Sequence, residues 1–115
     1  MTDIYELTAT AIATLGEEHA ADAYVTDEGV AIPDLYIVYT EVTGTPRQHA
    51  DDAETERFYR MQVSIFCRDG LVGLPDVERA MIAQGFNYAG DIKIPYNDET
   101  RHFGLAKDFT ILINQ

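Results

Sequence analysis

The chain has few of the residues on which enzyme and metal chemistry usually depend. Its 115 residues include one cysteine, Cys67, one serine, Ser64, and no tryptophan. A single cysteine excludes an intramolecular disulfide and a cysteine-built zinc site. No apolar run approaches the roughly 20 residues that a membrane helix needs. The first residues carry acidic Asp3 and Glu6 instead of the basic start of a signal peptide. We therefore expect a cytoplasmic protein without a membrane segment.

Positive charge is also scarce. Eight Lys and Arg residues face 20 Asp and Glu residues, which gives a formal net charge of −12. Phosphate backbones and anionic membranes attract basic surfaces, so ordinary nucleic-acid binding and membrane binding are both disfavoured. Two interpretations of the acidity stay open. In the first, the acidic residues provide solubility. In the second, they let a surface of the protein lie close to nucleic acid without adhering to it.

The length and the apolar fraction of 46% are sufficient for one globular domain over residues 1–115. Apolar residues at helical spacing predict a helix over Ile4–Leu15, with Asp3 as its N-cap and Gly16 beyond its end. A second helix is predicted over Pro75–Gln84, because proline and acidic residues suit a first helical turn.

Alternating apolar residues predict the strands. The clearest alternation runs from Tyr59 to Cys67, and we interpret it as the central strand of a small sheet. Leu35–Val42 is apolar on both faces, which predicts cover on both. Two further strands are predicted. One is Phe86–Ile94, with a break or bulge at Gly90, and the other is His102–Asn114, whose apolar face is interrupted by Lys107. We expect an α+β fold with one mainly antiparallel β-sheet and two α-helices packed on one face.

The segments before Leu35 give weaker signals. Gly16–Ala23 is acidic and alanine-rich, which favours a linker or a short extra turn. Tyr24–Val25 and Val30–Ile32 flank Asp27-Glu-Gly29, which favours two short extended pieces on either side of a turn.

Thr43–Glu54 has no apolar periodicity and contains Gly44 and Pro46. It predicts a long mobile loop between two strands, one that becomes ordered against a partner. The end of this segment and the residues just after it form an acidic run, which consists of Asp51, Asp52, Glu54 and Glu56. The run lacks the ligand spacing and the glycine of a calcium loop, so a solvated or partner-facing run is favoured over a metal site.

No catalytic constellation can be assembled from the remaining residues. Cys67 is in phase with the apolar face of its strand, so we expect a buried structural thiol. His19, His49 and His102 show no metal-ligand spacing. We expect no catalytic residues, no cofactor and no metal.

Several stretches together resemble the small head–tail joining proteins of long-tailed bacteriophages, a group that includes tail terminator and tail completion proteins. They are Tyr36-Ile-Val-Tyr-Thr-Glu-Val-Thr-Gly-Thr-Pro46, the polar segment with Ala50-Asp-Asp, Tyr59-Arg-Met-Gln-Val-Ser-Ile-Phe-Cys67, the short helix ending at Gly85-Phe86, and the closing strand.

The resemblance implies a structural virion protein with no enzyme activity. Such subunits form a ring, usually a hexamer, at the head-proximal end of the tail tube. The ring contacts the tail tube protein and the head connector, and genomic DNA passes through it without specific binding. Assembly takes place in the host cytoplasm. Arg47, Arg57 and Arg60 put positive charge in and beside the predicted loop, and we expect them to face neighbouring subunits together with the acidic run.

Two other classes of function stay open. One is an acidic regulatory or inhibitor module that imitates nucleic acid and binds a basic protein. The other is a small enzyme or ligand-binding domain, which would need a pocket with converging polar groups.

Overall fold

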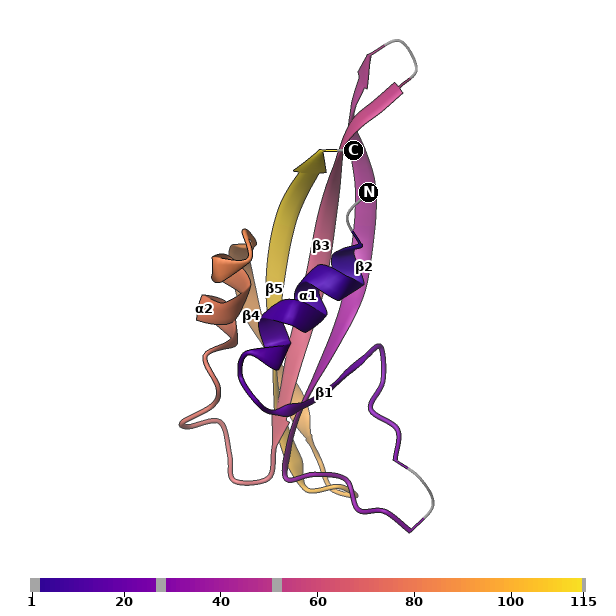
Figure 1. Cartoon of the computed structure of the whole chain (residues 1–115). Helices are drawn as coiled ribbons and strands as arrows, with labels where there is room; N and C mark the ends of the chain where they lie inside the picture. The colour runs from indigo at the N-terminus through magenta and orange to yellow at the C-terminus, as the bar shows by residue number, and fades with distance from the viewer. Residues whose placement is uncertain (1–2, 27–28, 51–52, 115) are drawn as a thin grey trace.

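In a computed structural model, which describes residues 3–26, 29–50 and 53–114, the chain forms two helices and five strands (Figure 1). Their order and bounds are α1 (Ile4–Ala13), β1 (Glu18–Ala21), β2 (Leu35–Ala50), β3 (Ala53–Cys67), α2 (Val77–Ala83), β4 (Asn87–Asn97) and β5 (His102–Asn114).

All five strands belong to one sheet in the order β1-β2-β3-β5-β4. Only the β1–β2 pair is parallel, and the other three pairs are antiparallel. The predicted α+β fold with a mainly antiparallel sheet is therefore confirmed. The strand containing Tyr59–Cys67 is the middle strand, as its long alternation predicted.

Both helices begin at an aspartate that satisfies free backbone N–H groups. Asp3 Oδ1 accepts hydrogen bonds from Tyr5 N at 2.9 Å and Glu6 N at 3.4 Å, and Asp76 Oδ1 accepts one from Arg79 N at 3.0 Å. The helices are shorter than predicted. Residues 14–16 form a turn that ends at Gly16 with φ 71°, and Gly85 follows α2 with φ 98°. Glycine adopts this conformation at little cost.

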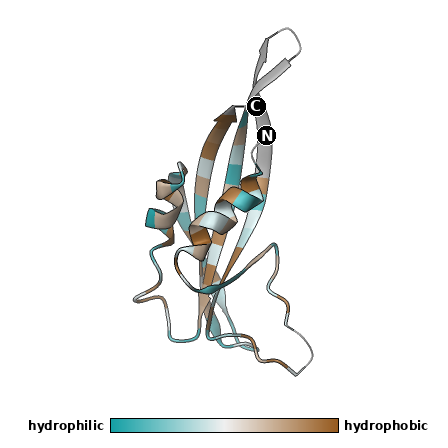
Figure 2. Ribbon diagram, in the orientation of Figure 1, coloured by the Kyte–Doolittle hydropathy of each residue, from teal (hydrophilic) through white to brown (hydrophobic). Residues whose placement is uncertain are grey.

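The hydrophobic core lies between the two helices and one face of the sheet (Figure 1). The sheet contributes odd-numbered residues of β2, β3 and β5, which point to the same side because strand side chains alternate. The alternation of hydrophobic and hydrophilic residues along β3 and β5 is visible in Figure 2. The buried core side chains include Ile12, Ile37, Met61, Val63, Ile65, Val77, Met81, Phe86 and Phe109. This face is called the helix face below, and the opposite one the open face.

The prediction of a long loop over Thr43–Glu54 is wrong. Thr43–Ala50 extends β2, and Ala53 and Glu54 begin β3; Asp51 and Asp52 lie outside the described residues. β5 ends beside Glu56, so beyond that point β2 and β3 pair only with each other and project past the sheet (Figure 1). We call this segment, 47–50 and 53–56, the ribbon. With no helix beside it, it needs no apolar face, and apolar periodicity therefore could not reveal its strands.

The segment before Leu35 also differs from the prediction. Glu18–Ala21, expected to belong to a linker or a short extra turn, is strand β1 and pairs with Tyr36–Tyr39 of β2. The short extended pieces predicted at Tyr24–Val25 and Val30–Ile32 are not strands. β1 lacks the β-branched and aromatic residues that mark a strand in sequence, so its pairing comes from tertiary context.

The last two strands follow the prediction closely. β5 has the predicted bounds, and β4 contains a register shift between Tyr88 and Gly90, where a break or bulge was expected. Gly90 has φ 129°, a value that residues with a Cβ rarely adopt.

Candidate assembly interface

The residues predicted for assembly that the structure describes lie on two neighbouring strands. Arg47 is on β2 and Glu54, Glu56, Arg57 and Arg60 are on β3. Pairing places Gln48 beside Glu56, and Pro46 beside Arg57. The ribbon therefore gathers Arg47, Glu54 and Glu56, whereas Asp51 and Asp52 lie outside the described residues.

Arg57 and Arg60 point to opposite faces of the sheet. Arg57 shares the helix face with Tyr59, and its guanidinium carbon lies 6.0 Å from the centre of that ring. Arg60 is on the open face, where its Nη2 contacts Asp108 Oδ2 at 2.5 Å. The two arginines therefore cannot approach the same surface of a neighbouring subunit.

Asp108 and its partners lie near the middle of the open face. The Asp108 side chain is 7% exposed, whereas that of Arg60 is 44% exposed. Gln62 Nε2 also donates to Asp108 Oδ1, at 3.3 Å. The carboxylate is thus neutralised and held by two neighbours on β3, as a buried charge requires.

The open face carries little net charge although the chain is strongly acidic. Where β3, β5 and β4 pair, the residues on this side are Arg60, Gln62, Ser64 and Phe66 of β3, Gly104, Ala106, Asp108 and Thr110 of β5, and Gly90, Ile92 and Ile94 of β4. The Arg60–Asp108 pair supplies the only charges in this set, and the two compensate each other. A second protein surface can therefore approach without strong repulsion.

Two strand edges are open within the described part of the chain. β4 is the last strand of the sheet, and no described strand pairs with its outer edge. β1 covers β2 over Tyr36–Tyr39, and Tyr5 Oη accepts a hydrogen bond from Glu41 N, so no described strand pairs with the outer edge of β2 from Val42 onward. Unpaired strand edges present rows of N–H and C=O groups that can pair with another chain.

A polar cluster that sequence analysis missed fixes the point where β1 stops. Asp22 Oδ1 accepts hydrogen bonds from Tyr5 Oη at 2.9 Å and from Thr40 Oγ1 at 2.6 Å. Tyr5 Oη in turn accepts one from the backbone N of Glu41 at 3.0 Å. The bonds from Thr40 and Tyr5 lower the pKa of Asp22, and burial raises the pKa of Tyr5. Because the three residues come from distant segments, only the fold brings them together.

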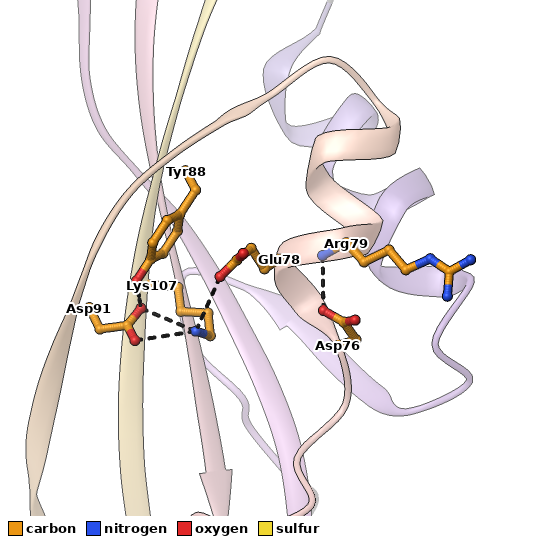
Figure 3. Close-up of polar contacts among 6 residues, drawn as sticks. All are labelled: Asp76, Glu78, Arg79, Tyr88, Asp91 and Lys107. Carbon is orange, nitrogen blue, oxygen red and sulfur yellow. Dashed lines mark hydrogen bonds and ion pairs between the residues drawn. The ribbon is translucent and has the colours of Figure 1, made fainter.

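A second polar cluster lies between α2 and the β4–β5 pair (Figure 3). Lys107 Nζ contacts Asp91 Oδ1 and Oδ2 at 3.1 and 3.3 Å, and Glu78 Oε1 at 3.9 Å. Tyr88 Oη donates to Asp91 Oδ1 at 2.5 Å. The bulge at Gly90 makes this possible, because it lets Tyr88 and Asp91, three residues apart, point to the same face. The hydrogen bond to Asp91 raises the pKa of Tyr88 to about 12, and the same bond lowers the pKa of Asp91.

The remaining candidates for chemistry are structural. Cys67 is buried, as predicted. His102 is buried, and its Nε2 donates to the backbone oxygen of Pro33 at 2.8 Å, since a carbonyl can only accept. Among the described residues, no three His, Cys, Asp or Glu side chains are arranged to hold a metal ion. No helix in the described ranges is long and apolar enough to span a membrane.

Comparisons with models of known protein families and with curated proteins find no match to this chain. The sequence resemblance to head–tail joining proteins therefore stays a prediction.

Proposed function

We propose that the chain is a structural virion protein of a long-tailed phage or prophage, a tail terminator or tail completion subunit. In this proposal copies of the chain form a ring, a hexamer by resemblance, at the head-proximal end of the tail tube. The ring joins the tail tube protein to the head connector, and DNA passes through it without specific binding. Assembly takes place in the host cytoplasm, and the subunit has no enzyme activity or cofactor.

The observation that carries the proposal is the pair of open edges on opposite sides of the sheet. β2, β3, β5 and β4 alternate in direction, because each neighbouring pair is antiparallel. If β4 of one copy lies beside β2 of the next, the two strands are antiparallel again. Different surfaces then meet at each contact, and heterologous contacts of this kind generate a ring when the rotation closes.

Charge is compatible with such a contact. The part of the open face where β3, β5 and β4 pair brings little net charge to the interface, although each copy carries a formal charge of −12. The remaining acidic surface would not adhere to DNA phosphates, which favours passage through a bore. β1 blocks the part of β2 at Tyr36–Tyr39, so neighbouring copies would meet with a stagger along the strands.

The decisive test is the mass and shape of the particle in solution, by native mass spectrometry and electron microscopy. We expect a ring, and Ile92→Glu should shift it toward monomer, because this residue is on β4, on the open face, and is 56% exposed. Ile82→Glu is the matched control, since Ile82 is 49% exposed on α2, away from the open face. A monomer at every concentration, or equal effects of the two variants, would contradict the proposal.

The arginines give a second test of the interface. Arg57→Glu and Arg60→Glu together should weaken assembly if the base of the ribbon contacts a neighbour. Because the two side chains lie on opposite faces, the single variants assign the contact to one face. Arg60→Glu also places a carboxylate beside Asp108, so its folded state must be verified by circular dichroism. An unchanged oligomer mass in the double variant would remove both residues from the interface.

A different outcome would favour the acidic module that imitates nucleic acid. Such a protein would stay monomeric and capture a basic protein at low salt, with weaker binding as salt rises.

A further inference from the structure

A surface hollow of about 400 Å³ lies on the helix face, between the segment that leads into α2 and strand β5. Its apolar lining comes from both sides and includes a floor of buried Val77. The lining residues are Leu71, Leu74, Pro75, Asp76, Val77, Glu78, Leu105 and Lys107.

Exposed apolar side chains occur in the same loop and strand as the lining residues. Val72 lies between two lining residues in sequence and is 95% exposed, the largest value among the exposed large hydrophobic side chains. Phe103 precedes Leu105 by two residues, on the same face of β5, and its ring lies 4.7 Å from that of Tyr96. Both rings are partly exposed. Exposed aromatic and aliphatic side chains of this kind are typical of protein interfaces.

The rim of the hollow is acidic. Glu78 and Lys107 point toward each other across the gap between α2 and β5, and Asp91 holds the same ammonium group from β4 (Figure 3). The Lys107 side chain is only 16% exposed, so its charge is largely taken up by these two carboxylates. Asp76 adds a third carboxylate. The only other cation drawn here, Arg79, extends away from the cluster in Figure 3.

We propose that this hollow docks a segment of another protein, with one apolar side chain in the hollow and Lys or Arg residues beside it on the rim. The three carboxylates exceed the single ammonium, which favours a cationic occupant. A second copy of this chain is disfavoured as occupant, because it brings a formal charge of −12. A polar small molecule is also disfavoured, because Lys107, Glu78 and Asp91 already satisfy one another.

The inference goes beyond the ring and does not depend on it, since docking is measured on the free chain. The probes are two synthetic peptides, acetyl-Lys-Leu-Phe-Leu-Arg-amide and its acidic counterpart acetyl-Glu-Leu-Phe-Leu-Glu-amide. Methyl NMR spectra of the protein report binding residue by residue. We expect the basic peptide to shift the methyl signals of Leu71, Leu74 and Leu105, and the acidic peptide to leave them unchanged.

Variants separate the apolar centre from the acidic rim. Val72→Ser should weaken binding of the basic peptide about tenfold, because it removes apolar area from the contact. Val25→Ser is the matched control, because Val25 is 85% exposed on a different loop, and its binding should not change. Glu78→Gln should weaken binding up to about fivefold, with a smaller effect at high salt.

Four results would overturn the inference. They are absence of methyl shifts with the basic peptide, equal binding of the acidic peptide, equal effects of Val72→Ser and Val25→Ser, and loss of self-association in Val72→Ser. The last result would make a second copy the occupant. The oligomer mass of the unchanged protein tests the ring separately, so either proposal can fail without the other.

Discussion

The two faces of β3 have the same backbone and opposite roles. On the helix face, Met61, Val63 and Ile65 are fully buried beneath the helices and contribute to the core. On the open face, Arg60, Gln62 and Ser64 alternate with them, and a single ion pair with Asp108 holds the centre. The helix face therefore carries most of the core, whereas the open face carries polar and exposed side chains that are available for contacts with other molecules.

The largest expected effect tests this division directly. Ile65→Ala should lower the free energy of unfolding by about 2–5 kcal/mol, because it leaves a cavity in the core. Ser64→Ala, one residue away on the open face, should change it by no more than about 0.5 kcal/mol. Urea unfolding followed by circular dichroism measures both. Equal losses would mean that the two faces of β3 contribute equally to stability.

A glycine on the open face gives the next largest effect. A Cβ at Gly104 would lie 2.8 Å from the Cβ of Ile94 and 3.1 Å from Cε1 of Phe66. Gly104→Ala should therefore destabilise the fold by about 1–3 kcal/mol, since the neighbouring strand must move. Thermal unfolding measures the loss, and the double variant with Phe66→Leu should recover part of it. A neutral Gly104→Ala would show that β4 separates from β5 easily.

The ion pair on the open face should have a smaller effect. Asp108→Asn should cost about 1–2 kcal/mol, because it removes the charge that Arg60 and Gln62 bind. A double-mutant cycle with Arg60→Gln isolates the interaction, and we expect the two changes to be clearly non-additive. Additive changes would show that the pair does not hold the centre of this face.

The smallest effect concerns pH and the cluster on the helix face. Tyr88 has its pKa raised from 10.0 to about 12, so its hydrogen bond to Asp91 contributes stability below pH 10 that is lost as pH rises through 12. Asp91 has a lowered pKa, so its contribution is present above its ordinary value of 3.8 and is lost in stronger acid. Tyr88→Phe should flatten the stability profile between pH 10 and 12. Denaturant midpoints across this range measure it, and an unchanged slope would contradict the assignment.

Sequence patterns predicted most elements that border the core. β3 and β5 alternate because one face of each is buried, and their periodicity is therefore visible. β1 and the ribbon escaped prediction for the converse reason. Glu18–Ala21 and the ribbon are held by backbone pairing, and Glu18–Ala21 contributes no residue to the buried core.

The candidate sites were less predictable than the fold. The opposite directions of Arg57 and Arg60 follow from extending the alternation of Tyr59–Cys67 by two residues, so the sequence contained that signal. No sequence pattern predicted the contact between Lys107 and Asp91, because it depends on strand register and on the bulge at Gly90. In the sequence, Lys107 is visible only as an interruption of the apolar face of its strand.

The position of β3 in the sheet also constrains the order of events during synthesis. Its pairing with β2 is a hairpin, which needs only neighbouring sequence and can form as soon as Cys67 is available. The other edge of β3 stays unpaired until β5 is synthesised. Phe103 of β5 then pairs with Cys67, and Asn114 pairs with Glu56. Non-local pairing of this kind forms slowly. Until β5 is made, the core lacks Phe109, Ile111 and Ile113, and the apolar side chains that pack against them stay exposed on the growing chain.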